Sequence, residues 1–395
     1  MRSFGERVQR IAGVLACWTM LAGAAMAQQN KGAMAQQNGD VPRPDLITNP
    51  ECWPPPCWSP SCDECDLIRS RCPNKCDYIL FPPRLGWYFA ADGGGLVRQL
   101  TREVNFAAAA NLTNTVLSTR DLDADFKMAG HFLVGHSLNE CFQIEGVFTG
   151  VAAADNTATV RNTTRNSLGG QGILSSPFGG FGSSAVSGLD FNDFAQIHYH
   201  SSLRGAELNI RRQVPMPPDR LMASVIFGVR YLDLPEGFDY LTHSNAPTPG
   251  GARNTIHVAT DNQMVGPQIG TLFEMYIDNR WWMNFEAKAA VLNNRARQST
   301  LFNNVSHTAF AGEFAFSDHG DHTAFAGELD LTFVYRWSPG LITRLGYQAL
   351  FMSGVALATE NLGTSITLLT QGPAQLNHDG SILYHGPYAG IEFGW

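Results

Sequence analysis

Residues 324–337 read AFAGELDLTFVYRW, and apolar and polar side chains alternate along most of this stretch. Because successive side chains of a β-strand point to opposite faces, the pattern predicts a strand with one apolar and one polar face. The apolar face carries Phe325, Leu329, Leu331, Phe333, Tyr335 and Trp337. The polar face carries Glu328, Asp330, Thr332 and Arg336. The period alone fits two folds, since a polar face meets water in a soluble sandwich and lines the lumen in a membrane barrel.

The same alternation recurs along the chain, for example in residues 86–98, 140–150 and 281–290. We predict ten strands, which start near Trp87, Phe126, Glu140, Phe194, Leu221, Met264, Trp281, Ala324, Leu341 and Ile382. The links between them alternate between short turns (137–139, 214–219, 278–280, 338–340) and long segments (100–125, 151–193, 235–262, 295–322, 355–381). Short turns at one end and long loops at the other, with an even number of strands, are typical of an outer-membrane barrel.

We therefore predict an all-β fold, a transmembrane antiparallel up-and-down β-barrel of about ten strands. Its short turns are expected in the periplasm and its long loops outside the cell. Twelve strands are the alternative, if the segment 151–193 contains a further hairpin.

The chain ends on YHGPYAGIEFGW, residues 384–395. Ile391, Phe393 and Trp395 share the apolar face of this predicted last strand. A closing strand with an aromatic end is typical of an outer-membrane barrel. We interpret these three residues as a barrel-insertion signal for the barrel-assembly machinery, with outer-membrane lipid around the finished barrel.

The first residues predict export. Arg2, Arg7 and Arg10 precede an apolar run and small residues, which is the pattern of a secretory signal peptide over residues 1–27. Cleavage is expected after Ala27, with Ala35 as a second site. Later residues include no apolar run of eighteen, so a membrane crossing would have to use strands. The formal net charge is −8 and no basic run occurs, so we expect no nucleic-acid partner.

Residues 28–84 form a Cys- and Pro-rich segment, and residues 85–395 form the predicted barrel. The cysteines of the segment are Cys52, Cys57, Cys62, Cys65, Cys72 and Cys76. In an exported protein this density predicts disulfide bonds, with a zinc knot as the alternative. Because both ends of an even-stranded barrel lie at the short turns, we expect the segment in the periplasm, where it would plug the pore or contact the cell wall.

Several stretches resemble the putative beta-barrel porin family seven, a set of outer-membrane proteins with signal peptides. They are residues 86–100 (GWYFAADGGGLVRQL), 200–212 (HSSLRGAELNIRR), 227–240 (FGVRYLDLPEGFDY), 266–275 (GPQIGTLFEM), 285–294 (FEAKAAVLNN) and 388–395 (YAGIEFGW). The resemblance spans roughly residues 83–395. It implies a porin, and it supplies neither catalytic residues nor a defined substrate.

The polar faces of the predicted strands supply the candidates for the lumen. They are Asp92, Glu145, His198, His200, Arg204, Arg230, Glu286, Lys288, Glu328, Asp330, Arg336, Arg344 and Glu392. The polar positions of residues 196–211 change phase near Gly205, which predicts a bulge there. His198 and His200 lie two residues apart and have the spacing of metal ligands on a strand, although such pairs are more often polar fillers.

We expect transport by passive diffusion of small polar solutes through a narrow lumen, because about ten strands leave little internal space. The alternative is a non-conducting anchor or surface-adhesion protein with a plugged lumen. We expect no enzymatic activity, no cofactor and no metal. Asp318, His319, Asp321 and His322 fall in a predicted loop, where a solvated role is favoured over binding of a cation.

Overall fold

The computed structural model describes residues 86–394, with gaps at 101–102, 110–113, 123–125, 140, 165–171, 187, 217–220, 245–251, 279, 305–311, 339 and 373–375. The predicted signal peptide, the six cysteines of the Cys- and Pro-rich segment and Trp395 lie outside the described residues.

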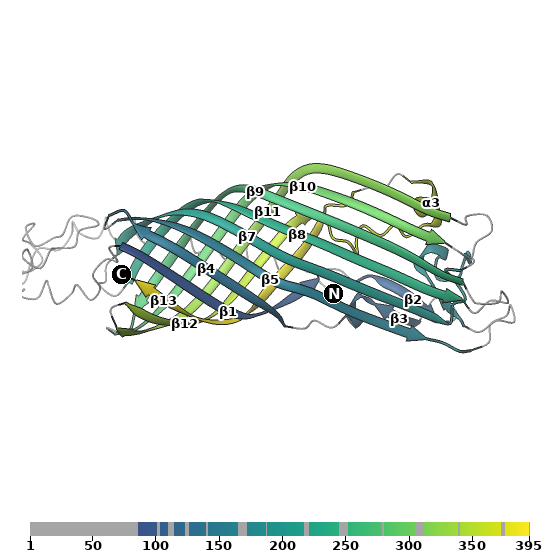
Figure 1. Ribbon diagram of the computed structural model, residues 1–395, viewed down its shortest axis with the longest axis horizontal. Helices are drawn as coiled ribbons and strands as arrows, with labels where there is room; N and C mark the ends of the chain where they lie inside the picture. The colour runs from purple at the N-terminus through teal and green to yellow at the C-terminus, as the bar shows by residue number, and fades with distance from the viewer. Residues whose placement is uncertain are drawn as a thin grey trace, which may run out of the picture.

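Ten antiparallel strands close into a barrel, as the alternation and the loop lengths predict (Figure 1). They are β1 (Gly86–Leu100), β4 (Lys127–Ser137), β5 (Phe142–Arg161), β7 (Phe194–Met216), β8 (Leu221–Ser244), β9 (Ala252–Tyr276), β10 (Trp281–Asn304), β11 (Gly312–Ser338), β12 (Leu341–Val355) and β13 (Gly380–Gly394). Each barrel strand pairs with the barrel strands before and after it in the chain, and β1 pairs with β13 to close the barrel. Among the described residues, the segment 151–193 adds no further strand to the barrel.

The connections are short at one end of the barrel. In one of these turns, between β9 and β10, Asp278 Oδ1 accepts hydrogen bonds from the backbone N–H groups of Arg280 (2.7 Å) and Trp281 (2.8 Å). Such side-chain bonds to the following backbone stabilise tight turns.

The connections at the other end are long and carry short elements of their own, β2 (Asn105–Ala109), β3 (Asn114–Ser118), η4 (Thr119–Asp121), β6 (Leu174–Ser175), η5 (Pro177–Gly179) and α3 (Ile366–Gln371). Strands β3, β2 and β6 form a separate sheet.

Among the described residues, no helix has the length and apolar character needed to cross a bilayer.

A belt of outward-facing apolar side chains surrounds the part of the barrel near the short turns. It includes Phe132, Phe148, Leu208, Phe227, Val229, Ile269, Phe285, Val291, Phe333, Leu345 and Ile391, all of them exposed. Trp87, Trp281 and Trp337 lie at its short-turn edge. An apolar band with aromatic residues at its edge is the lipid-facing surface of an outer-membrane barrel.

Beyond this belt the two faces of the wall exchange their polarity. On β8 the outward positions change from Val229 and Tyr231 to Asp233 and Asp239, while the inward positions change from Arg230 to Leu232, Leu234 and Phe238. Strands β5 and β7–β11 continue well past the belt, whereas β1, β12 and β13 are much shorter (Figure 1). The extended strands thus form an extracellular sheet with water on its outer face, so its apolar residues turn inward.

Apolar residues of the long loops cover the inner face of this extracellular sheet. Phe106, Leu117, Leu174, Phe178 and Leu189 are buried against wall residues that include Tyr199, Phe238, Tyr240, Ile256 and Phe302. The hydroxyl of Tyr240 donates to the backbone oxygen of Phe106 at 2.9 Å. The loops and the extended strands together form an extracellular lobe with its own hydrophobic core.

Three expectations about the strands are wrong. The segments 235–262 and 295–322, expected as loops, are largely strand, because β8 and β10 run to Ser244 and Asn304 and β9 and β11 begin at Ala252 and Gly312. The β7–β8 register is unchanged on both sides of Gly205, and the bulge lies instead on β5, between Val151 and Ala154. Asp318, His319, Asp321 and His322 lie within β11 rather than in a loop. These errors have one physical cause, because the exchange of polarity outside the membrane resembles a change of phase or a loss of the strand pattern in the sequence.

Candidate functional site

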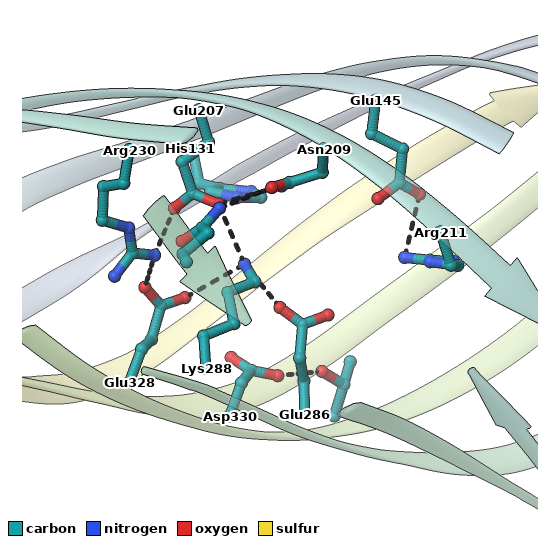
Figure 2. Close-up of polar contacts among 12 residues, drawn as sticks. His131, Glu145, Glu207, Asn209, Arg211, Arg230, Glu286, Lys288, Glu328 and Asp330 are labelled. Atoms are coloured by element: carbon teal, nitrogen blue, oxygen red, sulfur yellow. Dashed lines mark hydrogen bonds and ion pairs between the residues drawn. The ribbon is translucent and has the colours of Figure 1, made fainter. Parts of the chain in front are cut away.

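The lumen inside the lipid-facing belt holds a network of buried charged side chains (Figure 2). Arg230 of β8 forms ion pairs with Glu207 of β7 and Glu328 of β11. Lys288 of β10 adds contacts from its Nζ to Glu286 Oε1 (2.5 Å), Glu207 Oε2 (3.4 Å) and Glu328 Oε1 (3.5 Å). Three carboxylates and two cations from four strands therefore meet across the lumen.

Amide side chains add hydrogen bonds to this network. Gln268 Nε2 donates to Glu207 Oε2 at 2.9 Å and to Asn209 Oδ1 at 2.5 Å, and Asn209 Nδ2 donates to Glu207 Oε2 at 3.0 Å. Buried charges are tolerated only when opposite charges and hydrogen bonds compensate the loss of water. Each charged side chain of the network has at least one oppositely charged partner here, and Glu207 also accepts the amide hydrogen bonds.

Three further clusters of polar side chains line the lumen at the level of the lipid-facing belt. Arg211 Nη2 contacts Glu145 Oε1 at 2.9 Å, and the hydroxyl of Tyr88 donates to the same carboxylate at 2.5 Å. Asp330 Oδ1 accepts from Thr332 (2.5 Å) and Tyr388 (2.8 Å).

The third cluster lies near the closure of the barrel. Arg344 approaches Asp92 (3.6 Å) and Glu392 (3.9 Å), and His131 Nδ1 lies 3.1 Å from Asp92 Oδ2.

The charged network fills the lumen at its level. Its five side chains are between 1% exposed, at Arg230, and 20% exposed, at Glu286 and Glu328. Water in an open channel would reach the groups that line it, so these values describe a packed layer. Ten strands favour such packing, because an eight-stranded barrel is already filled by side chains and open channels belong to about sixteen strands.

A second, apolar layer lies above the charged one. Its wall residues include Leu96, Leu203, Leu232, Leu234, Met264, Leu292 and Met352, all buried. Val355 at the end of β12 belongs to this layer, and the segment between β12 and β13 enters it with Leu357.

Buried polar groups fix that segment inside the barrel. The Asn262 side chain bonds both backbone groups of Ala356, at 2.9 and 2.7 Å, and Gln298 Nε2 donates to Asn361 O at 3.0 Å. Glu236 accepts from Ala358 N at 2.9 Å and forms an ion pair with Arg98. We call residues 356–379 the plug loop.

Most of the predicted lumen residues lie on the inner face. They are Asp92, Glu145, Arg230, Glu286, Lys288, Glu328, Asp330, Arg336, Arg344 and Glu392. Sequence reasoning missed Glu207 and Arg211 as lumen candidates, although their spacing with Asn209 marks one face of a strand. It also missed the Arg98–Glu236 pair, because Glu236 lies in a segment predicted as a loop.

His198, His200 and Arg204 are a correction, because they lie on the outer face of β7. They alternate with the buried Ile197, Tyr199 and Leu203. This part of β7 belongs to the extracellular sheet, where polar residues face water on the outside.

The outer face there carries a row of alternating histidines and aspartates. His198 Nε2 lies 2.7 Å from Asp155 Oδ1 on β5, and His198 Nδ1 lies 3.0 Å from Asp239 Oδ2 on β8. His257 Nδ1 of β9 lies 2.6 Å from Asp239 Oδ1. Hydrogen bonds with Asp239 raise the pKa of both histidines, and the bond with His257 in turn lowers the pKa of Asp239.

His200 lies next to this row. Its ring centroid is 6.0 Å from that of His198, and its ring occupies the space that a side chain at Gly237 would need. His198, His200 and Asp239 each offer a ligand atom, and these atoms lie within 4.8 Å of one another. His200 also borders a cavity of about 630 Å³ whose lining includes Asp261, Arg297 and His319.

Comparison with solved structures finds other membrane barrels. The chain is 8% identical to the outer membrane protease OmpT from Escherichia coli, with 80% of this chain and 98% of that chain covered and a TM-score of 0.45. It is 10% identical to the CymD monoaromatic hydrocarbon channel (82% and 91% covered, TM-score 0.30). It is 9% identical to Ail, the attachment invasion locus protein of Yersinia pestis (78% and 99% covered, TM-score 0.21).

The sequence comparisons give one match. No curated protein matches the chain. The model of the family described as putative beta barrel porin-7 matches residues 95–393, which span the barrel from β1 to β13.

Proposed function

The chain belongs to the putative beta barrel porin-7 family, and we propose that it is an outer-membrane barrel that conducts no solutes and presents its extracellular lobe at the cell surface. The observation that carries the proposal is the double closure of the lumen. A paired charged layer lies inside the lipid belt, and an apolar layer sealed by the plug loop lies above it.

The energetics favour a permanent closure over a gate. Moving the plug loop would break its buried hydrogen bonds to Asn262, Gln298 and Glu236 and expose Leu357 to water. Each unmade buried hydrogen bond costs about 1–3 kcal/mol. The summed cost opposes opening in the absence of a ligand.

Passive diffusion of small polar solutes is the second candidate, and the family description and the charged lumen favour it. It requires a water-filled path past Arg230, whose side chain is 1% exposed. We rank it below the closed barrel for this reason.

The proposed setting combines the predicted export signal with the barrel. Lipid of the outer membrane surrounds the belt, the last strand is recognised by the barrel-assembly machinery, and the N-terminal segment contacts the cell wall. We propose no enzymatic activity.

Planar-bilayer recording of the refolded mature chain tests the proposal. A closed barrel gives no discrete current steps, whereas passive diffusion gives steps that grow with salt concentration. A shift in gel migration on heating shows that the recorded sample is folded. Steps from the folded wild-type protein would overturn the proposal in favour of diffusion.

The surface location is tested separately in whole cells. Glu313 is exposed on the outer face of β11 in the extracellular lobe, and Trp281 lies at the periplasmic edge of the belt. A membrane-impermeant thiol reagent is expected to label the Glu313→Cys variant and to leave Trp281→Cys unlabelled above the wild-type background.

A further inference from the structure

The row of histidines and aspartates on the outer face of the extracellular sheet has no part in closing the lumen. We propose that His198, His200 and Asp239 form a binding site for a divalent late transition-metal ion, of which zinc is the reference.

The register of the sheet brings the three ligands together. His198 and His200 are two residues apart on β7, so their side chains share its outer face. Asp239 of β8 lies directly opposite His198. The sequence supplies the histidine pair alone, since the third ligand comes from a strand portion that sequence reasoning assigned to a loop.

The distances suit an inserted ion. A tetrahedral ion with bonds of about 2.0–2.2 Å holds neighbouring ligand atoms roughly 3.3–3.5 Å apart. His198 Nδ1 and Asp239 Oδ2 are now 3.0 Å apart, and the ligand atoms of all three residues lie within 4.8 Å of one another. Small side-chain rotations bring them to the bonding distance.

The outer groups that orient metal ligands are already in place. With His198 bound through Nδ1, its Nε2–H donates to Asp155 Oδ1, now 2.7 Å away. His257 holds the other oxygen of Asp239 at 2.6 Å. Carboxylate–histidine–metal arrangements of this kind fix the ring orientation and make the ligand more basic.

His200 distinguishes a metal site from a simple chain of ion pairs. Pairing of His198 with its two carboxylates accounts for His198, Asp155 and Asp239. It leaves His200 unexplained, because His200 is exposed and makes no hydrogen bond with any described residue. A side chain at Gly237 would exclude its ring, since an ideal Cβ there lies 1.9 Å from His200 Cε1.

The donor set selects the class of metal. Two imidazole nitrogens and one carboxylate oxygen suit zinc and its late first-row neighbours, whereas calcium and magnesium prefer oxygen ligands alone. Three protein ligands leave a fourth position for water or a small anion. His200 also borders the cavity of about 630 Å³.

Zinc titration of the refolded full chain in detergent, in competition with a zinc-binding chromophore, tests the site. We expect the wild-type protein to bind one ion that depends on His200, and His200→Ala to weaken its binding at least about tenfold. The matched control is His243→Ala. His243 lies on β8, the strand that carries Asp239, and pairs with Asp193 at 2.8 Å. Its removal is expected to leave the zinc affinity unchanged.

A second variant keeps all three ligands. Gly237→Ala displaces the His200 ring and is expected to weaken zinc binding as His200→Ala does, with the same heat-dependent gel shift as the wild type. The proposal fails if the wild-type protein binds no zinc. It also fails if His200→Ala binds zinc as tightly as His243→Ala, because the ion would then be held elsewhere, for example by the cysteines.

Discussion

Arg230 is the residue on which the charged layer of the lumen depends. Its side chain is 1% exposed and forms ion pairs with Glu207 and Glu328. Replacement by Met keeps the bulk but leaves two carboxylates with Lys288 as their remaining cation. We expect Arg230→Met to lower the free energy of unfolding by roughly 3–5 kcal/mol, as found for buried pairs that lose one partner. Guanidinium unfolding in detergent, followed by tryptophan fluorescence, measures it.

Arg204→Met is the matched control, because Arg204 is exposed on the outer face of β7 and its replacement should change the stability by less than about 0.5 kcal/mol. Adding Glu328→Gln to Arg230→Met removes one uncompensated charge and is expected to restore part of the loss. Equal stabilities for Arg230→Met and Arg204→Met would contradict the role of the ion pairs.

Asp190 carries a pH dependence in the extracellular lobe. Its carboxylate accepts the backbone N–H groups of Ser176 (2.8 Å) and Val186 (2.7 Å), yet burial dominates and raises its pKa above 3.8. The folded state therefore favours the protonated form. The resulting stabilisation is complete below pH 3.8 and is lost as the pH rises through the folded pKa. We expect hydrogen exchange around Asp190, corrected for intrinsic rates, to show that local opening becomes easier as the pH rises through that window.

Asp190→Asn removes the titrating group, so its local stability should not vary across the same window. It should also be lower by about 1–3 kcal/mol at every pH, because an amide accepts with one oxygen and its NH₂ faces a backbone N–H. An unchanged pH dependence in Asp190→Asn would assign the effect to another group.

Gly94 decides how closely the first and last strands approach. An ideal Cβ at Gly94 lies 2.4 Å from Pro387 O and 2.7 Å from Tyr388 Cβ, whereas at Gly93 it meets nothing within 4 Å. We therefore expect Gly94→Ala to destabilise the barrel by roughly 1–3 kcal/mol through overpacking at the β1–β13 seam. Gly93→Ala should stay close to wild type. The two variants are compared by refolding in a urea series and scoring the folded fraction by the heat-dependent gel shift. Equal urea midpoints for the two variants would contradict the steric account.

At the scale of strands, alternation predicted the ten barrel strands and their order because the lipid belt imposes one simple rule. The upper parts of β5 and β8–β11 were predicted as loops, since outward residues there, such as Asp261 and His319, are polar. On β7 the same change of environment suggested a bulge at Gly205. A period-two pattern marks a strand in both zones, but its apolar face reverses where the surroundings change from lipid to water.

Residues of the candidate site could be predicted from the sequence only where the alternation along a single strand decides which face they occupy. Glu328 and Asp330 fall on the inner face because they alternate with lipid-facing leucines. The pairing of Arg230 with Glu328 was not predictable, because these residues come from strands that are not neighbours in the sheet and their contact depends on the size of the closed lumen. Asp239 joins His198 only through the register of the extracellular sheet.

At the scale of the whole molecule, the same wall of strands faces lipid over its lower part and water over its upper part. The lower part is polar inside and apolar outside, and the upper part reverses this order around a core of loop residues. The lobe therefore stands on the barrel without a linker, because its sheet continues the barrel strands. A closed lumen needs little beyond the packing that is already present. An open channel would have to pass through both the apolar layer of the lumen and the hydrophobic core of the lobe.

The two closures lead to a prediction about the complete barrel. Replacing the plug loop by a short turn removes Leu357, Leu362 and Leu369 from the interior but leaves the charged layer intact. We expect this variant to give no current steps in planar bilayers. Steps should appear only when Glu207, Arg230, Lys288 and Glu328 are also replaced by Ser, which removes four of the five side chains of the charged layer while keeping the lumen polar. Conductance after loop removal alone would show that the plug loop is the main barrier and that ions pass the charged layer. Silence from the folded combined variant would show that ten strands leave no ion path even without those side chains.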